Sequence, residues 1–66
     1  MITKIADYIL DWNYESKKGT IVLVFENRHS EAIKELEHLD FLVIKSVLKK
    51  GNSHIDFNNK TIFNKK

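Results

Sequence analysis

Three side chains able to bind metal, Glu31, Glu35 and His38, are spaced so that they would share one face of a helix. The spacing Glu-x-x-His supplies two ligands in di-iron carboxylate bundles, but such sites need a second copy of the motif and further carboxylates. This chain holds one copy, and its three histidines lack the spacing of zinc ligands. The pattern therefore indicates a solvated acidic face, and we expect no metal and no other cofactor.

Catalytic patterns are weak as well. Asp7, Asp11 and Glu15 recur every four residues, but paired carboxylates perform acid–base chemistry only where a pocket separates their pKa values. A chain of 66 residues has little interior from which to build that pocket. It also has no cysteine, and its two glycines lie too far apart for a phosphate-binding loop. We predict a protein that is not an enzyme and has no small-molecule substrate.

Charge is distributed unevenly along the chain. Residues 1–44 carry five cations and eight carboxylates, a net −3, whereas residues 45–66 carry six lysines and one aspartate, a net +5. Lysines attract phosphates or carboxylates, and aromatic side chains beside them stack on bases or anchor protein interfaces. We therefore predict a partner-binding surface on the basic second half and at one aromatic residue of the first half: Lys45, Lys49, Lys50, Lys60, Phe63 and Trp12.

Two function classes fit this surface. The first is a small regulatory or inhibitory protein that binds a partner macromolecule, and the many Lys, Ile and Asn residues suggest an accessory protein of a bacterium, phage or virus. The alternative is a small nucleic-acid-binding protein that uses the lysines and exposed aromatic side chains. Binding to an oligonucleotide that weakens steeply with salt would separate the two classes.

The elements that must position these residues begin with a strand at Thr20–Phe25, where five consecutive apolar residues are rich in β-branching. This run predicts a central strand that is buried on both faces. The polar segment 16–19 before it predicts a hairpin turn with Gly19 at positive φ. We expect a strand through Trp12–Glu15, while residues 2–11 fit a helix or a strand.

The next segment predicts the helix. Ser30 is a suitable N-cap, and Ala32, Ile33, Leu36 and Leu39 form one apolar stripe, which favours a helix from 30 to 40. Residues 41–44 and 47–48 then predict a strand, followed by a second turn at 49–52. One long helix over 30–50, ended by Gly51, is the main alternative. Segments 53–57 and 61–63 complete the expected sheet.

A short repeat supports two hairpins. Lys17-Lys18-Gly19 recurs 32 residues later as Lys49-Lys50-Gly51, as expected if two hairpins share the same turn chemistry. The predicted fold is thus a single small α+β domain over residues 1–66, in which two β-hairpins flank one helix. Its antiparallel sheet, of ββαββ type, is covered by the helix on one face.

The predicted core follows from these elements and holds ten apolar residues: Ile21, Leu23, Phe25, Ile33, Leu36, Leu39, Leu42, Ile44, Ile55 and Phe57. Truncation of Leu36 to alanine should lower stability by roughly 2–5 kcal/mol. A core this small predicts a homodimer at micromolar concentration, formed by pairing of sheet edges or by the apolar surface around Trp12 and Tyr14. No apolar run is long enough for a membrane span, and the N-terminal segment carries charge too early for a signal peptide, so we expect a cytoplasmic protein with no membrane contact.

Overall fold

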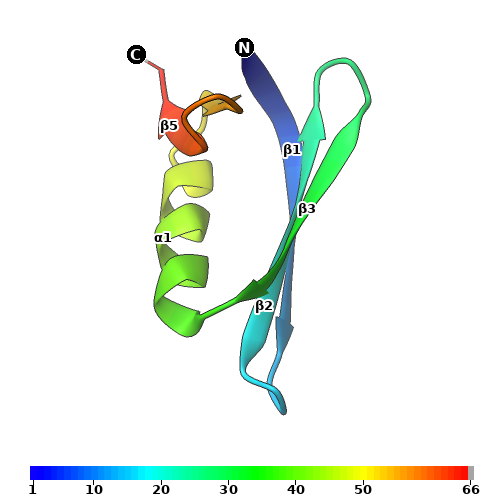
Figure 1. Cartoon of the computed structure of the whole chain (residues 1–66), viewed down its shortest axis with the longest axis vertical. Helices are drawn as coiled ribbons and strands as arrows, with labels where there is room; N and C mark the ends of the chain where they lie inside the picture. Colours follow the sequence, from blue (N-terminus) through cyan, green and yellow to red (C-terminus); the bar gives the residue numbers. More distant parts are fainter. Residues whose placement is uncertain (66) are drawn as a thin grey trace.

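The structure, a computed structural model, describes residues 1–65 and contains five strands and one helix (Figure 1). The helix and four of the strands follow a long first strand, and together they confirm the predicted α+β class. The bounds are β1 Ile2–Asn13, β2 Lys18–Phe25, β3 Ser30–Leu36, α1 His38–Lys49, β4 Ser53–Asp56 and β5 Thr61–Asn64.

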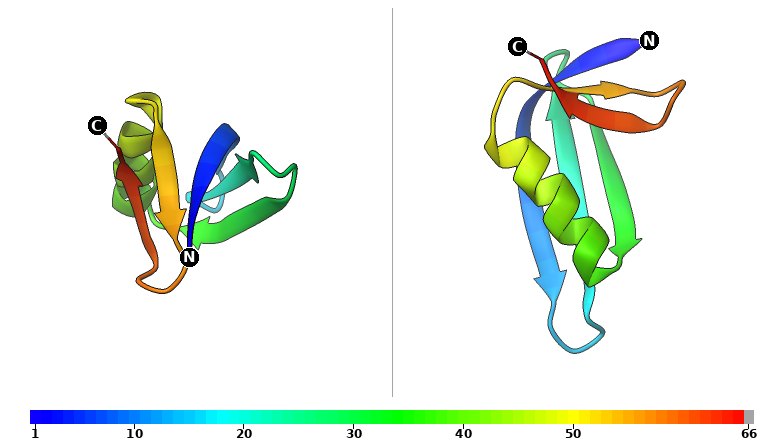
Figure 2. Two further views of the ribbon diagram at one scale, coloured as in Figure 1. Left: turned by 90° about the horizontal axis from the view of Figure 1, so that it is seen from above. Right: turned by 90° about the vertical axis from the view of Figure 1, so that its left-hand side faces the viewer.

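All five strands form one antiparallel sheet in the order β3-β2-β1-β4-β5. Strand β1 belongs to both halves of the sheet. Its residues Ile2–Lys4 pair with β4, and its residues from Ile5 onward pair with β2. A bulge between Ile5 and Asp7 accompanies this change of partner. Seen from above, the sheet bends at β1, with β4, β5 and α1 on one side and β2 and β3 on the other (Figure 2).

Residues 2–11, for which the sequence fits either a helix or a strand, belong to strand β1. Ile5 is buried and Tyr8 and Trp12 are half-buried on the side that faces α1. The predicted strand Trp12–Glu15 is too long by two residues, because the chain turns at residue 14. The side-chain oxygen of Asn13 accepts hydrogen bonds from the backbone N–H groups of turn residues 15 and 16 (3.0 and 3.1 Å). The hairpin turn predicted at 16–19 lies two residues earlier, at 14–17.

Gly19 has a different role from the one predicted. The turn residue with positive φ is Lys17 (φ 59°), whereas Gly19 lies within β2, opposite Trp12 on one side and Leu36 on the other. A β-carbon at position 19 would lie only 2.7 Å from Cε1 of Phe41 on α1. The glycine is therefore required because the helix approaches the sheet too closely for any side chain there.

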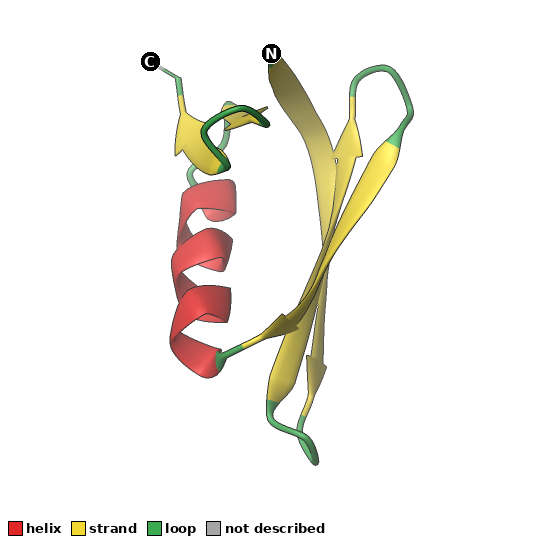
Figure 3. Ribbon diagram, viewed as in Figure 1, coloured by secondary structure: helices red, strands yellow, loops and turns green. Residues whose placement is uncertain are grey.

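Strand β2 was predicted correctly in position, but it is covered on only one face. Ile21, Leu23 and Phe25 are buried towards α1, while Val22 and Val24 on the opposite face are half-exposed. Figure 3 shows the reason, since the helix lies on one side of the strands and no element within residues 1–65 covers the other side.

The helix predicted over 30–40 is wrong, because residues 30–36 form β3. This strand pairs with the free edge of β2, with Ile33 opposite Ile21 and Ala32 opposite Val22. The register between β2 and β3 shifts after Ile33, and Glu35 has a positive φ of 58°. This irregularity places the side chain of Leu36 on the side of the sheet that faces the helix, beside Gly19. Pairing with β2 thus overrides an apolar spacing that also fits a helix.

The strand predicted over 41–48 is also wrong, because this segment is helical. Phe41, Ile44 and Leu48 have the spacing that places three side chains on one face of a helix, and that face packs on the sheet. The alternative long helix was correct only for its second part, where Gly51 follows the helix with φ 82°. The two Lys-Lys-Gly segments therefore end different structures, a hairpin turn and a helix.

The strands predicted at 53–57 and 61–63 are confirmed by β4 and β5, which form a hairpin with its turn at 57–60. The predicted hairpin turn at 49–52 is wrong, because the segment before it is α1 and not a strand. Of the ten predicted core residues, four are buried (Ile21, Leu23, Phe25 and Ile55) and three are half-buried (Ile33, Leu36 and Ile44). Leu39, Leu42 and Phe57 are exposed, which corrects the prediction for these three. The buried hydrophobic residues that were not predicted are Ile5, Phe41 and Leu48.

Over residues 1–65 the helix is too short to cross a lipid bilayer.

Substitution of Gly19 by alanine should lower the free energy of unfolding by about 1–3 kcal/mol, because the new methyl group must displace the ring of Phe41. Urea unfolding followed by circular dichroism measures this loss. In a background carrying Phe41→Leu the same substitution should cost clearly less. Gly51→Ala is the control, since nothing lies near a β-carbon there and its cost should be the same in both backgrounds. Equal costs of Gly19→Ala in the two backgrounds would contradict this packing.

A pair of leucine truncations tests the corrected positions. Leu36→Ala should still destabilise, by about 2 kcal/mol at the lower end of the range for buried leucines, because Leu36 packs against the core from β3. Leu39→Ala should change stability by less than about 0.5 kcal/mol, because its side chain is exposed. Thermal melting of both variants makes the comparison, and equal losses would place Leu39 in the core after all.

Candidate interaction surface

Helix α1 and its C-cap carry three of the six predicted binding residues, Lys45, Lys49 and Lys50, so the local determinants of the helix come first. Glu37 occupies the N-cap with extended backbone (φ −66°, ψ 159°) and makes no side-chain capping bond. Asp40 lies in the first turn and Lys49 in the last, where each charge complements the helix dipole. The charges and the following Gly51 therefore favour a helix of this length and direction.

One face of α1 points away from the sheet. Phe41 and Leu48 are buried, so the helical period directs Leu39, Leu42 and Val43 outward. The exposed fractions of these three residues are 74%, 41% and 62%. We call the outward side the outer helix face, and it consists of Leu39, Leu42, Val43, Ser46, Lys49 and Lys50.

The apolar part of this face was missed at the sequence level. Leu39 had been assigned to the stripe of a helix over 30–40, and Leu42 to a strand, so both were expected in the core. The signal that identifies them is the spacing of Phe41, Ile44 and Leu48, which leaves Leu39 and Leu42 on the opposite side of a helix that begins at residue 38.

Lysines lie on both flanks of the outer helix face. Lys45, Lys49 and Lys50, with Leu42 and Ser46, line a shallow hollow of about 410 Å³ on one flank. On the other flank lies an apolar groove of about 540 Å³ between α1, β3 and the β4–β5 hairpin. Its lining is Glu31, Ile33, Val43, Ile44, Val47, Ile55, Phe57, Lys60, Thr61 and Ile62. Four of the six predicted binding residues therefore border one surface.

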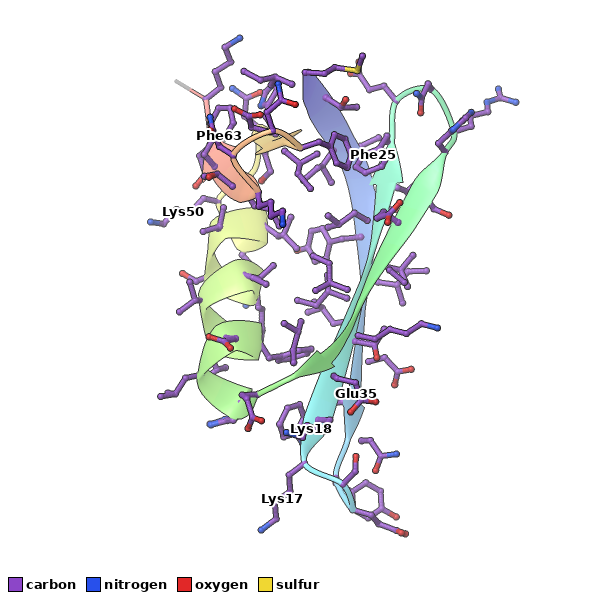
Figure 4. All side chains as sticks on the ribbon, viewed as in Figure 1. Lys17, Lys18, Phe25, Glu35, Lys50 and Phe63 are labelled. Atoms are coloured by element: carbon purple, nitrogen blue, oxygen red, sulfur yellow. The ribbon has the colours of Figure 1, made fainter. Side chains whose placement is uncertain are left out.

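The other two predicted residues lie elsewhere. Phe63 is half-buried on β5 and stacks on His54, with ring centroids 5.7 Å apart and an angle of 23° between the rings. Figure 4 places Phe63 and Lys50 at one end of the molecule and Lys17 at the other. Trp12 is half-buried near the start of α1 and packs against His38 and Phe41, at 5.6 and 5.3 Å between ring centroids. Its ring belongs to the packing of the helix, and its role in binding stays a prediction.

The lysines of α1 carry uncompensated charge. Lys4 pairs with Glu26 at 3.6 Å and Lys18 pairs with Glu37, but within residues 1–65 no carboxylate lies within 4.0 Å of Lys45, Lys49 or Lys50. Exposed ion pairs contribute little to the free energy of folding, so leaving these lysines unpaired lowers stability only slightly. Their ammonium groups therefore remain available to a partner.

The acidic residues that were expected on a helix lie on edge strand β3 instead. Glu31 borders the apolar groove, and Glu35 occupies the irregular position with positive φ. The Glu31–Glu35–His38 spacing therefore does not place three side chains on one helical face. Within residues 1–65 no group of three His, Asp or Glu side chains is arranged to hold a metal ion.

Asn64 fixes the basic end of α1 to the sheet. Its side-chain amide donates hydrogen bonds to the carbonyl oxygens of Val47 (2.8 Å) and Gly51 (2.9 Å), and it lies 3.2 Å from Oγ of Ser53. The last carbonyls of a helix lack the usual partner within the helix. The Val47 carbonyl also accepts from the backbone N–H of Lys50 (3.3 Å), and the Asn64 amide adds a shorter hydrogen bond from β5. The position of Lys49 and Lys50 therefore depends on β5.

Asp56 organises the turn between β4 and β5, next to Lys60. Its carboxylate accepts hydrogen bonds from the backbone N–H groups of Asn58 (3.0 Å) and Asn59 (3.3 Å) and from the Asn59 amide (2.8 Å). Partial desolvation raises the pKa of Asp56, but these hydrogen bonds, first those from Asn59, lower it more, so the pKa lies below its ordinary value of 3.8. The turn is thus held by a charged carboxylate at neutral pH.

Asn64→Asp should lower the free energy of unfolding by about 1–3 kcal/mol, because a carboxylate cannot donate to the carbonyls of Val47 and Gly51. Chemical unfolding measures the loss. Asn13→Asp is the matched control and should cost less, since the Asn13 side chain accepts hydrogen bonds through its oxygen, as a carboxylate also can. If both variants lost the same stability, the Asn64 amide would not hold the end of α1.

Comparisons with protein-family models, with curated protein sequences and with solved structures gave no match for this chain.

Proposed function

We propose that this chain is a non-enzymatic protein-binding module with a regulatory or inhibitory role, and that it docks a partner on the outer helix face. The observation that supports the proposal most strongly is the exposure of Leu39 and Val43 on a helix whose other face already packs on the sheet. Exposed apolar side chains gathered on one surface and bordered by polar groups mark interaction sites.

The lysines indicate the kind of partner. Lys45, Lys49 and Lys50 on one flank and Lys60 on the other border the apolar side chains. Within residues 1–65 none of these lysines forms an ion pair, and Glu31 is the one carboxylate in the lining of the groove. Such an arrangement fits a partner surface with an apolar centre and an acidic border. Apolar contacts then supply most of the affinity, and the lysines accelerate association and fix the orientation.

The dimensions suit this mode of docking. A helix of 12 residues is about 18 Å long, which limits the contact made by the outer helix face alone to a small interface. The apolar groove beside Val43 extends that contact, because it can receive side chains of the partner next to the exposed leucines. A partner that uses both features gains area without any change in the fold.

A nucleic-acid-binding function is the second candidate, and one observation favours it. The stacked rings of His54 and Phe63 lie on the same side of the sheet as Lys4, which is the register partner of His54. Aromatic faces beside a cation are the elements from which single-strand binding surfaces are built. Lys4 is, however, paired with Glu26, and Asp56 lies on the neighbouring register position.

The test compares two double charge reversals of equal size. Lys49→Glu/Lys50→Glu should weaken binding to the partner about tenfold or more, because it reverses the charge of the outer helix face. Lys17→Glu/Lys34→Glu is the control, since both lysines are exposed and lie outside that face. The partner is first identified by a photo-crosslinking amino acid at Val43, with the same group at Lys34 as control, and binding is then measured by calorimetry.

Two results would contradict the proposal. One is normal binding by Lys49→Glu/Lys50→Glu together with a loss in the control variant. The other is tight binding of the purified chain to a single-stranded oligonucleotide that weakens steeply between low and moderate salt and is lost on His54→Ala/Phe63→Ala. The second result would favour the nucleic-acid candidate.

A further inference from the structure

The second half of β1 leaves one of its edges unpaired. Strand β4 pairs only with Ile2–Lys4, so from Asp7 to Asn13 the strand pairs with β2 alone. In the right-hand view of Figure 2 this part of β1 lies at the border of the sheet. Unpaired strand edges present N–H and C=O groups that can pair with another chain.

Strands β3, β2 and β1 form a part of the sheet with two free edges, one on β3 and one on the second half of β1. The two edges differ in how well they are protected against pairing with another chain. Edge strand β3 carries Glu31, Lys34 and Glu35 and has an irregular register near Glu35, all of which oppose pairing with another strand. The free part of β1 carries two carboxylates, Asp7 and Asp11, but no lysine, and its pairing with β2 is regular from Asp7 onward. It also exposes apolar surface, because Ile9 is 58% exposed. The β1 edge is therefore the one open to association.

Hydrogen bonds show which backbone groups point to this edge. The N–H of Tyr8 bonds the Asp7 side chain (2.8 Å), and the N–H of Phe25 on β2 bonds His29, on the side away from β1. Backbone N–H and C=O groups point alternately to the two sides of an antiparallel strand. The N–H and C=O groups of Leu23 and Ile21 therefore also point towards β3. Their partners on β1, Tyr8 and Leu10, together with Trp12, then point their backbone groups to the free edge.

We infer that two copies of this chain associate as a symmetric dimer through antiparallel pairing of their β1 edges, with Leu10 on the twofold axis. Leu10 is the midpoint of the free segment Asp7–Asn13, so this register pairs the whole segment. It places Leu10 opposite its own copy and Tyr8 opposite Trp12 of the second copy. Apolar and aromatic pairs directly opposite each other stabilise a sheet.

Charge supports this register over its neighbours. With Leu10 at the centre, Ile9 faces Asp11 of the second copy and Asp7 faces Asn13, so no carboxylate faces another. Centring on Ile9 would place Asp7 opposite Asp11, and centring on Asp11 would place two Asp11 carboxylates together. Like charges directly opposite each other destabilise a strand pair.

The ends of the paired segment offer a second, independent match. Tyr14 is 79% exposed in the turn after β1. In the Leu10-centred register it comes opposite Ala6 of the second copy, and Ala6 borders a hollow of about 140 Å³ lined also by Ile5, Tyr8 and Leu48. By symmetry each copy offers one tyrosine and one hollow, as an interface with twofold symmetry requires.

The dimer and the proposed function are tested separately, because sedimentation of the purified chain needs no partner. Sedimentation of the purified chain alone should show a species of twice 7.8 kDa in the micromolar range. Leu10→Lys should weaken self-association about tenfold or more, because two ammonium groups would meet at the axis. Leu39→Lys, the same change on the outer helix face, should leave it intact.

Disulfide crosslinking tests the register, and the absence of other cysteines makes the result unambiguous. A mixture of Ile9→Cys and Asp11→Cys proteins should form a mixed disulfide under mild oxidation faster than either protein alone forms its own. Faster crosslinking of Ile9→Cys alone would overturn the Leu10-centred register. A monomer throughout the micromolar range, or a dimer that Leu39→Lys disrupts and Leu10→Lys does not, would overturn the dimer itself.

Discussion

The close contact between Gly19 and Phe41 is the constraint on which the rest of the structure depends. One helix must cover the apolar face of the sheet, and the ring of Phe41 reaches the backbone of β2 only because residue 19 has no side chain. Trp12 and Leu36 lie on the strands at either side of Gly19, and both pack against the same core. The glycine between two larger residues thus leaves a depression in the sheet, on which the first half of α1 packs.

The contact between Phe41 and Gly19 determines which side of α1 faces solvent. Once Phe41 points to the sheet, the helical period directs Leu39, Leu42 and Val43 outward, and the outer helix face follows without further contacts. The second half of α1 is held by a different interaction, the amide of Asn64 on the carbonyls of Val47 and Gly51. The two attachments come from opposite halves of the bent sheet, so the surface they orient depends on the whole fold.

Local patterns predicted part of this structure. Strands β2, β4 and β5 follow from β-branched and apolar runs next to turn residues, and the end of α1 at Gly51 was visible in the alternative long helix. Segment 30–36 was misassigned because its apolar spacing suits a helix as well, and only pairing of Ile33 with Ile21 decides for a strand. The lysines of α1 were predicted because they are neighbours in sequence. Lys60 joins them through tertiary packing, which spacing does not reveal.

The most direct measurement is the set of nuclear Overhauser effects and ring-current shifts at Gly19. With the helix seated as described, the α-protons of Gly19 should show strong Overhauser effects to the ring protons of Phe41, and ring currents should displace their chemical shifts from ordinary glycine values. The methyl groups of Leu39 should show none to β2. The contrary result, methyl contacts from Leu39 or Val43 to β2 and an unshifted Gly19, would mean that another face of α1 packs on the sheet.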